Sequence, residues 1–225
     1  MGNTYAEITP KIKELTQLCL DNSQIDASLY TKYQVNRGLR DLKGKGVLTG
    51  LTEISEIQSS VEINGESVPC EGKLFYRGID IEQIVGGFIQ EKRYGFEETV
   101  YLLLFGNLPS REQLADFQRV LADYRTLPTS FVRDIIMKAP SRSIMNKLEV
   151  AVLSLYAYDD NPDDTSLENM MRQSMELVAR LPVIAGQAYA VYRNTFFNKS
   201  LNLHNPRDGL STAENFLRIL RPDKS

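Results

Sequence analysis

The feature that most constrains the fold is a series of helix-start signals followed by apolar residues at helical spacing. Ser110-Arg111-Glu112-Gln113 is a capping box, in which the Ser110 and Gln113 side chains pair with backbone N–H groups of the first helical turn. Apolar residues then follow at three- and four-residue spacing, namely Leu114, Phe117, Leu121 and Tyr124. This combination predicts an amphipathic helix with one buried face.

The same pattern predicts further helices on both sides of residue 110. Thr9-Pro10 is typical of an N-cap followed by proline at the first helical position. Phe96 to Phe105 is apolar on most sides and stops at Gly106, which predicts a buried helix. A shorter helix is expected over Ile81 to Phe88, although Gly86-Gly87 weakens it. Thr129 is a candidate cap for a short segment with Val132, Ile135 and Ile136 facing inward.

Two long helices are expected in the second half of the chain. One starts near Ile144, where Ile144, Leu148, Ala151, Val152 and Leu155 are spaced for a single face. The other runs from about Ser166 to Arg193, with a kink expected near Pro182 because proline removes one backbone donor. An acidic loop, Asp159-Asp160-Asn161-Pro162-Asp163-Asp164, separates them. The fold class predicted is therefore mainly α.

A small β region interrupts this helical pattern at about residues 47–78. Residues 52–57 and 60–63 alternate between polar and apolar, as short strands do, and Asn64-Gly65 is a strong tight-turn signal. Residues 72–78 form a third extended candidate. We therefore predict an N-terminal helical segment and linker (1–46), the β region (47–78) and a helical remainder (79–225).

Composition excludes several classes of protein. The chain has 225 residues and a net charge of −3, so it has no electrostatic reason to bind nucleic acid or an anionic membrane. No apolar run reaches the roughly 18 residues of a membrane span, and the start does not resemble a signal peptide. Cys19 and Cys70 are too few for a disulfide framework or a four-ligand zinc site. We expect a cytoplasmic protein without a metal.

Two ligand-binding motifs fail on spacing. The Gly44-Lys45-Gly46 stretch lacks the third glycine of a dinucleotide fingerprint at the required position and has no Gly-Lys-Ser/Thr triplet. It is interpreted as a connecting turn, with a basic loop (Arg40, Lys43, Lys45) touching an anionic ligand as the alternative. The acidic loop after Asp159 lacks the glycine and glutamate that a calcium loop requires, so it is interpreted as a solvated connection between helices.

Two groups of residues on the last long helix indicate packing. Met170, Met171 and Met175 lie at helical spacing and are interpreted as core. The run Ala185-Gly186-Gln187-Ala188-Tyr189-Ala190 places small residues on an otherwise bulky helix, which permits close approach of another helix. Its partner could belong to this chain or to a second subunit.

The chain offers no complete set of acid–base residues. His204 is the only histidine, and it lies in a polar stretch that predicts a loop, where histidine is more often structural than catalytic. No plausible Cys/His pair and no nucleophile-elbow motif are present, and no carboxylate pair stands out as a buried acid–base couple. We therefore assign no catalytic residue to this chain.

Five stretches, in order along the chain, resemble the citrate synthase family in its bacterial form. They are Gly46-Val47-Leu48-Thr49-Gly50-Leu51-Thr52-Glu53-Ile54, Gly72-Lys73-Leu74-Phe75-Tyr76-Arg77-Gly78-Ile79-Asp80-Ile81, Phe96-Glu97-Glu98-Thr99-Val100-Tyr101-Leu102-Leu103-Leu104-Phe105-Gly106-Asn107-Leu108-Pro109, Ala179-Arg180-Leu181-Pro182-Val183-Ile184-Ala185 and Ser211-Thr212-Ala213-Glu214-Asn215-Phe216-Leu217. Each stretch is modest alone. Together they resemble the N-terminal portion of such an enzyme.

The resemblance implies a nearly all-helical, two-domain homodimer that condenses acetyl-CoA with oxaloacetate. In that mechanism an aspartate removes a methyl proton from the thioester, one histidine stabilises the enol and a second assists at the oxaloacetate carbonyl. Acetyl-CoA and CoA are co-substrates, and no tightly bound cofactor is implied. The long helices from Ile144 and Ser166 match those that the family uses at its subunit interface.

Carry-over of the family's residues to this chain is limited. The segment ending Asn215-Phe216 lies beside the oxaloacetate site in the family, which makes Asn215 the candidate substrate-binding residue. Many members carry histidine near the start of this segment, where this chain has Thr212. Because the catalytic histidines and aspartate belong to motifs that the family carries beyond this point, the 225-residue chain is expected to be inactive alone. The alternatives are a relative using a different acyl-CoA, such as a 2-methylcitrate synthase, and a non-catalytic helical assembly or regulatory module.

Overall fold

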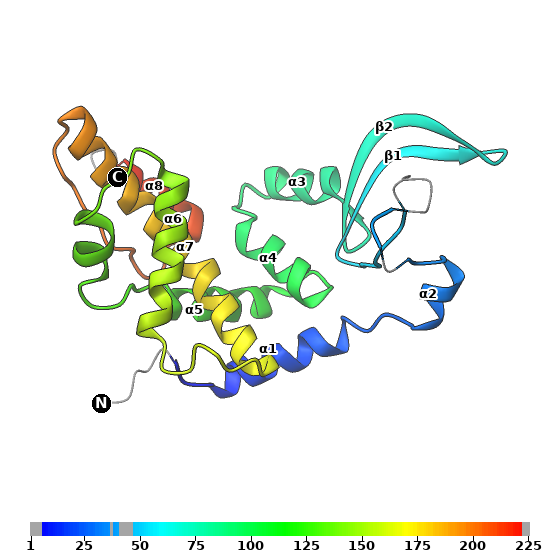
Figure 1. Cartoon of the computed structure of the whole chain (residues 1–225), viewed down its shortest axis with the longest axis horizontal. Helices are drawn as coiled ribbons and strands as arrows, with labels where there is room; N and C mark the ends of the chain where they lie inside the picture. Colours follow the sequence, from blue (N-terminus) through cyan, green and yellow to red (C-terminus); the bar gives the residue numbers. More distant parts are fainter. Residues whose placement is uncertain (1–5, 37, 41–46, 222–225) are drawn as a thin grey trace. The chain divides into compact units, whose positions relative to one another are not determined.

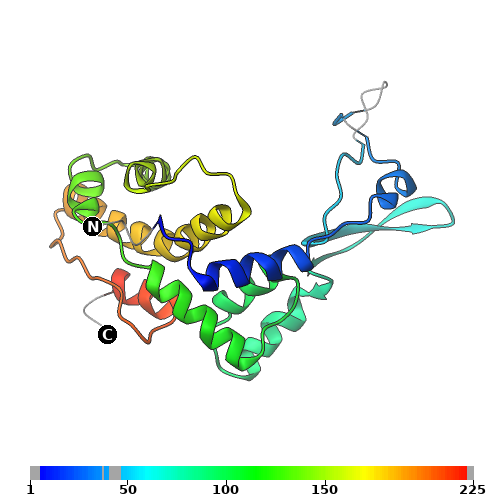
Figure 2. The ribbon, with the colours of Figure 1, turned by 90° about the horizontal axis from the view of Figure 1, so that it is seen from below.

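The computed structural model describes residues 6–36, 38–40 and 47–221, which divide into two compact units (Figures 1 and 2). One unit contains residues 1–16 and 110–225, and the other contains residues 17–109. These boundaries differ from the predicted division at residues 46 and 78, because that division followed changes of pattern whereas the units follow packing. Lys43, Lys45 and the turn at 44–46 lie outside the described residues.

The unit of residues 17–109 combines a small antiparallel sheet with helices. Its elements are α2 (Ser28–Lys32), β1 (Ser55–Ile63), β2 (Glu66–Tyr76), β3 (Ile79–Asp80), α3 (Ile81–Gln90) and α4 (Phe96–Phe105). The strands pair in the order β1-β2-β3. The predicted small β region is confirmed, although the two short strands expected over residues 52–63 are one strand and residues 47–54 contain none.

Both turns of the sheet use two residues in the left-handed conformation. Asn64 and Gly65 have φ of 55° and 82° and join β1 to β2, where Ile63 pairs with Glu66. Arg77 and Gly78 have φ of 49° and 80° and join β2 to β3. Such turns match the right-handed twist of the strands they connect, so the Asn-Gly signal predicts this hairpin correctly.

Arg77 fixes the second turn against the helices of its unit. Its guanidinium donates from Nε and Nη2 to the carbonyl oxygen of Leu103 at 3.1 and 2.9 Å, and from Nη1 to the carbonyl oxygen of Asn22 at 3.3 Å. Gly106 ends α4 with a φ of 84°, and a Cβ at this position would lie 3.0 Å from Cβ of Asn22. The glycine is therefore required by conformation and by space.

The unit of residues 1–16 and 110–225 is helical in its described part. Its elements are the first half of α1 (Pro10–Asp21), then α5 (Arg111–Tyr124), the π-helix η2 (Val132–Met137), α6 (Ile144–Leu155), the short 3-10 helix η3 (Tyr156–Tyr158), α7 (Leu167–Phe197) and α8 (Thr212–Leu220). The capping box at Ser110 is present as predicted. Helix α7 extends four residues beyond the predicted end, with Pro182 inside it.

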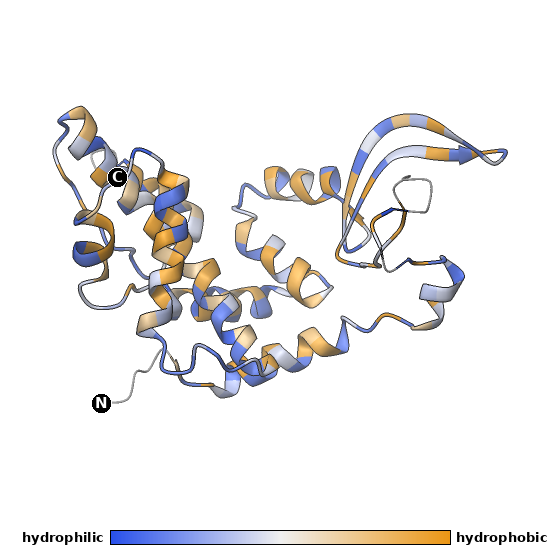
Figure 3. Cartoon of the chain, viewed as in Figure 1, coloured by the Kyte–Doolittle hydropathy of each residue, from blue (hydrophilic) through white to orange (hydrophobic). Residues whose placement is uncertain are grey.

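The core of this unit gathers around the middle of α7, and Figure 3 colours many residues of this helix as hydrophobic. One cluster joins η2, α6 and α7 through Phe131, Ile136, Ala151, Ile184, Ala188 and Val191. Met171 and Met175 are buried as predicted, but Met170 is half exposed, so the methionine stripe is only partly core.

The expected cap at Thr129 is absent. Phe131 occupies the N-cap position of η2 without a side-chain hydrogen bond, and Ser130 just before it has a φ of 65°. Left-handed backbone is strained for a residue with a Cβ. The segment therefore turns through Ser130, a conformation that its sequence does not indicate.

The small residues on α7 contact α8 of the same chain. A Cβ added to Gly186 would lie 2.5 Å from Cγ2 of Ile219, so α8 packs directly on the backbone of α7. Figure 2 shows the two helices side by side. The sequence left open whether the partner of these small residues belongs to this chain or to a second subunit. For Gly186 the partner is α8 of this chain.

Candidate functional site

Asn215, the predicted substrate-binding residue, is buried in the first turn of α8 and holds the loop before that helix. Its Oδ1 accepts a hydrogen bond from the backbone N–H of Arg207 at 2.8 Å. Its Nδ2 donates to the carbonyl oxygens of Arg207 and Leu210, both at 3.1 Å. Both amide hydrogens are therefore used inside the chain, and only the second lone pair of Oδ1 has no donor among these bonds.

The loop of residues 204–211, called here the 204–211 loop, has further carbonyl groups bound by side chains. The donor–acceptor pairs are Gln187 Nε2 to His204 O at 3.4 Å, Arg218 Nη1 to Asn205 O at 2.6 Å and Arg125 Nη1 to Leu210 O at 3.1 Å. The donors come from α7, α8 and the end of α5. Three helical elements thus fix one backbone segment, which is a form of preorganisation.

Thr212, the second residue that the family resemblance singles out, is the first residue of α8. It is buried, and its Oγ1 accepts a hydrogen bond from Nη2 of Arg125 at 3.4 Å. Just before it, Ser211 and Glu214 form a capping box, and hydrogen bonds from the Ser211 hydroxyl and backbone N–H lower the pKa of Glu214. The start of α8 is thereby fixed by its own cap and by Arg125.

His204 is half-buried in the same loop, which confirms the predicted loop location. Its carbonyl oxygen takes part in the anchoring described above. Within residues 47–221, no hydrogen bond to its imidazole is described. Its role, structural or functional, stays a prediction.

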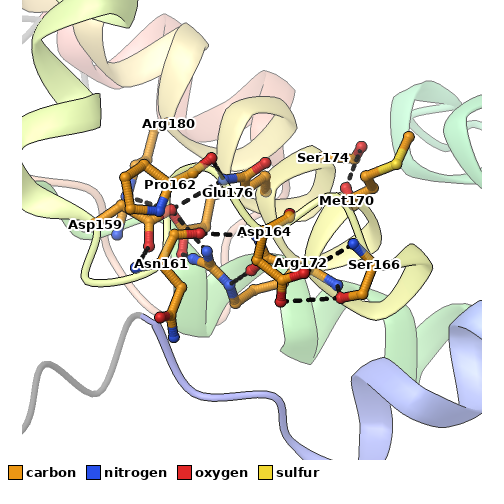
Figure 4. Close-up of polar contacts among 12 residues, drawn as sticks. Asp159, Asn161, Pro162, Asp164, Ser166, Met170, Arg172, Ser174, Glu176 and Arg180 are labelled. Atoms are coloured by element: carbon orange, nitrogen blue, oxygen red, sulfur yellow. Dashed lines mark hydrogen bonds and ion pairs between the residues drawn. The ribbon is translucent and has the colours of Figure 1, made fainter.

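A second polar site lies along α7, where three buried residues of this helix, Arg172, Glu176 and Arg180, form an ion cluster with the partly buried Asp159 of the preceding loop (Figure 4). Arg172 has no exposed side-chain surface and donates to Asp159 Oδ2 at 2.6 Å and Glu176 Oε1 at 2.8 Å. Arg180 donates to the other oxygen of Glu176 at 2.7 Å. Two positive and two negative charges balance inside the unit.

The ion cluster bears on two sequence-based interpretations. The loop from Asp159 to Asp164 is a mostly exposed connection between helices, as predicted, and Asn169 of α7 anchors it by donating to the carbonyl oxygens of Asn161 at 2.9 Å and Asp164 at 2.7 Å. Buried carboxylates also exist, since Glu176 is only 7% exposed. Charges at four-residue spacing on a long helix are usually solvated, so the burial of this face could not be predicted from the spacing.

The cluster shifts the pKa values of its two carboxyl groups in opposite directions. Burial raises the pKa of Glu176, against the opposing effect of Arg180 and Arg172. Burial also acts to raise the pKa of Asp159, but hydrogen bonds from Arg172, the backbone of Asn161 and Gln173 outweigh it and lower that pKa. Each carboxylate thus forms an ion pair with arginine, an arrangement that suits a structural role better than proton transfer.

Other buried charges were also missed by sequence reasoning. Glu97 and Glu98 in the first turn of α4 are buried, and Arg93 binds Glu98. Lys147 on α6 is buried, and burial lowers its pKa. Among the described residues, no group of three or more His, Cys, Asp and Glu side chains could hold a metal ion. No helix in the described part of the chain is long and apolar enough to span a membrane.

These observations define the class of the protein. It has a mainly helical fold with a small sheet in its first half, and helices anchor the loop before α8. Residues 41–225 match the family model described as "Citrate synthase, C-terminal domain". The chain belongs to the citrate synthase family.

Individual relatives agree with this assignment. The 2-methylcitrate synthase 1 of Corynebacterium glutamicum is 29% identical over 151 residues, covering 67% of this chain and 34% of that protein. A citrate synthase-like protein of Cochliobolus lunatus is 28% identical over 173 residues, covering 72% and 38%. The crystal structure of citrate synthase from Pyrobaculum aerophilum matches with a TM-score of 0.63 and 27% identity, covering 83% of this chain and 45% of that chain. This chain thus spans 34–45% of the length of these relatives.

Proposed function

We propose that this chain is part of a citrate synthase, an acyltransferase that condenses acetyl-CoA with oxaloacetate and water to give citrate and CoA at the entry to the tricarboxylic acid cycle. The observation that carries this proposal is the family match over residues 41–225. The named similarity to a 2-methylcitrate synthase supports a second candidate, a relative that uses another acyl-CoA. In both cases the CoA thioester is a co-substrate, no tightly bound cofactor is required, and the compartment proposed is the cytoplasm.

In this proposal the 204–211 loop and α8 form one wall of the oxaloacetate site. Asn215 fixes the loop with three hydrogen bonds, and a direct contact with substrate would use the remaining lone pair of its Oδ1. Thr212 is engaged by Arg125, so it does not take over the place of the family's histidine as a proton donor. The contribution of this wall is therefore shape and position rather than acid–base chemistry.

We further propose that the 225-residue chain does not catalyse the condensation by itself. The family's mechanism uses two histidines and an aspartate, and this sequence contains one histidine. The test is an assay for free thiol released from acetyl-CoA in the presence of oxaloacetate, with an intact citrate synthase as positive control. We expect no release above background, and oxaloacetate-dependent turnover by the pure chain would refute the proposal.

The partner proposed for this chain is a second copy, bound through α6 and α7. Large apolar side chains on these helices are exposed, notably Leu153 at 75%, Met145 at 70% and Met170 at 50%. These helices match the family's interface helices. We expect Leu153→Glu to lower the fraction of dimer measured by light scattering after size-exclusion chromatography. Ile89→Glu, at a residue of similar exposure (72%) on α3, serves as the control and should leave the fraction unchanged.

The rival function, a non-catalytic helical assembly or regulatory module, makes a different prediction. Such a module would assemble through the same exposed apolar residues, but the gene would end at Ser225. Sequencing the reading frame downstream of Ser225 separates the two. A continuation with further histidine-containing motifs supports the enzyme, and a stop codon supports the module.

A further inference from the structure

A cavity of about 320 Å³ lies between the C-terminal half of α7 and the end of α8, within the unit of residues 1–16 and 110–225. The apolar part of its lining consists of Gly186, Tyr189 and Ala190 of α7 and Ile219 and Leu220 of α8. Because α8 packs directly on the backbone of α7 at Gly186, a helix–helix contact fixes this part of the cavity. The volume lies at the lower end of the range for small-molecule sites.

The charged part of the lining is entirely positive. Arg193, Lys199 and Arg221 line the cavity, and among the described residues no carboxylate does. Lys199 and Arg221 are exposed and Arg193 is half-buried, so a ligand can reach them from solvent. The Cζ atom of Arg193 lies 5.9 Å from the ring centroid of Tyr189, which places this guanidinium beside another lining residue. The remaining polar groups, Ser200 and Asn202, are neutral hydrogen-bonding side chains.

These three cations have no counter-ion in the described part of the chain. Their side chains take part there in no ion pair and no hydrogen bond. Elsewhere in the unit, Arg172 and Arg180 are balanced by carboxylates of the ion cluster, and Arg133 is balanced by Asp134. The sequence from residue 177 to residue 207 contains no Asp or Glu. Positive charge therefore gathers at this cavity without the pairing that other arginines of the unit have.

A purely structural role explains only part of this charge. Cations are stabilising at the carbonyl ends of helices, and both α7 and α8 end beside the cavity. Each helix end carries the equivalent of only about half a negative elementary charge, so three cations at two helix ends leave a surplus of about two positive charges. Such a surplus raises the local concentration of anions.

We propose that this cavity binds a small phosphate monoester with an apolar ring. A phosphate monoester carries about 1.5 to 2 negative charges at pH 7, which matches the surplus, and three of its oxygens accept hydrogen bonds from guanidinium and ammonium groups. The ring lies against Tyr189, Ala190 and Ile219. The cavity shares the end of α8 with the substrate wall proposed above but contains no residue of the 204–211 loop, and phosphate binding here does not depend on that proposal.

Phenyl phosphate is a suitable probe, because it joins one phosphate monoester to one apolar ring. Relaxation-edited proton NMR of the ring resonances, titrated against the whole chain, measures its binding. We expect a Kd of about 1 mM, from the usual affinity per ligand atom. Phenyl sulfate has nearly the same shape with one negative charge fewer, so it should bind about tenfold more weakly. An increase in ionic strength from about 20 mM to about 200 mM should weaken the binding of phenyl phosphate more than that of phenyl sulfate.

Charge variants assign the binding to this cavity. Lys199→Glu replaces a cation by an anion at an exposed position and should abolish binding of phenyl phosphate. Arg193→Gln and Arg221→Gln should each weaken binding by about three- to tenfold. Arg142→Gln is the matched control, because Arg142 stacks on Phe196 of α7 without lining the cavity, and it should leave the Kd unchanged.

A lipid headgroup is the other source of the same chemical group. Vesicles of phosphatidylcholine that contain phosphatidic acid present a phosphate monoester at a membrane surface. We expect that they do not sediment the chain, because the apolar part of the ligand must enter the cavity beside its phosphate, and the acyl chains of a lipid stay in the bilayer.

Three results would overturn the proposal. The first is no saturable binding of phenyl phosphate up to about 10 mM, tenfold above the expected Kd. The second is an equal loss of affinity in Arg221→Gln and Arg142→Gln, or binding that survives Lys199→Glu, because the ligand would then respond to net charge or occupy another place. The third is sedimentation with the vesicles that Lys199→Glu abolishes, which would identify the ligand as a lipid.

Discussion

Two loops of the same unit are anchored to helices by different chemistry. The loop of residues 159–164 is held by the side chain of Asp159, which binds Arg172, and by carbonyl groups that accept from Asn169 and Gln173. The 204–211 loop is held through its backbone carbonyls, by Asn215, Gln187, Arg218 and Arg125. The first loop uses its own side chain, Asp159, for anchoring. In the second loop, the side chains of His204, Arg207 and Asp208 take part in no described hydrogen bond.

This difference indicates different uses. A loop whose side chain forms a buried ion pair has a structural role, and the stability of its attachment depends on the balance of charges in that pair. A loop held by its carbonyl groups keeps its side chains available for a ligand while its backbone stays fixed, which suits a binding site. The contrast supports placing the proposed substrate wall at the 204–211 loop and a structural role at the ion cluster.

The largest effect is expected at Arg172. Replacing it in Arg172→Met leaves Asp159 without its cation and Glu176 with Arg180 alone, so we expect a loss of about 3–5 kcal/mol in the free energy of unfolding. Urea denaturation measures this loss. Arg119→Met, which removes an exposed pair with Asp116, should change it by less than about 1 kcal/mol. Equal effects of the two variants would show that the cluster has no special structural role.

Asn215 tests the other loop. In Asn215→Asp the shape is kept, but a carboxylate then faces the carbonyl oxygens of Arg207 and Leu210 that Nδ2 had bound. We expect a loss of about 1–3 kcal/mol, from the unpaired buried groups, and faster hydrogen exchange at residues 207–211. Asn202→Asp, at an exposed position, is the control. Unchanged exchange in the loop would contradict the anchoring role of Asn215.

The parts of this structure that could be read from the sequence are those governed by local chemistry. The capping box at Ser110 and the Asn64-Gly65 turn are set by a few adjacent residues, and both are present. The ion cluster could not be foreseen, because Arg172, Glu176 and Arg180 have the spacing of a solvated helix face, and only the tertiary fold buries it. The cavity that Arg193, Lys199 and Arg221 line likewise depends on the packing of α8 on α7, not on neighbours in sequence.

A smaller effect is expected where the helices themselves meet. Gly186→Ala places a Cβ about where Ile219 already lies, at 2.5 Å from its Cγ2. Overpacking costs about 1–3 kcal/mol, and the higher helix propensity of alanine returns about 1 kcal/mol. We therefore expect a net loss of about 1 kcal/mol, measured by urea denaturation. In a protein that already carries Ile219→Ala, Gly186→Ala should no longer lower the free energy of unfolding, because the overpacking is gone. An unchanged loss in that background would argue against the direct α7–α8 contact.

The smallest effects concern pH, and they have opposite signs at the two carboxyl groups of the ion cluster. The pKa of Asp159 is lowered below 3.8, so the stability it contributes is present above that pH and is lost as pH falls through the folded-state pKa. The pKa of Glu176 is raised above 4.5, so the folded state binds its proton more tightly and stability rises as pH falls through that value.

Variants separate these two contributions. Asp159→Asn should make the chain lose less stability on acidification than the unmodified protein, and Glu176→Gln should make it lose more. Denaturation curves recorded between about pH 7 and pH 3 measure both slopes. Changes of the same sign in the two variants would show that the cluster titrates as one group.

We propose that these 225 residues supply part of the framework of the oxaloacetate site proposed above, without the groups that move protons. Enolisation itself can be measured in heavy water with oxaloacetate present, as the exchange of the acetyl-CoA methyl hydrogens for deuterium. Mass spectrometry detects this exchange separately from the whole reaction. The pure chain should give no exchange above the rate without protein, while an intact citrate synthase incorporates deuterium or forms product. Methyl exchange catalysed by this chain alone would contradict the account.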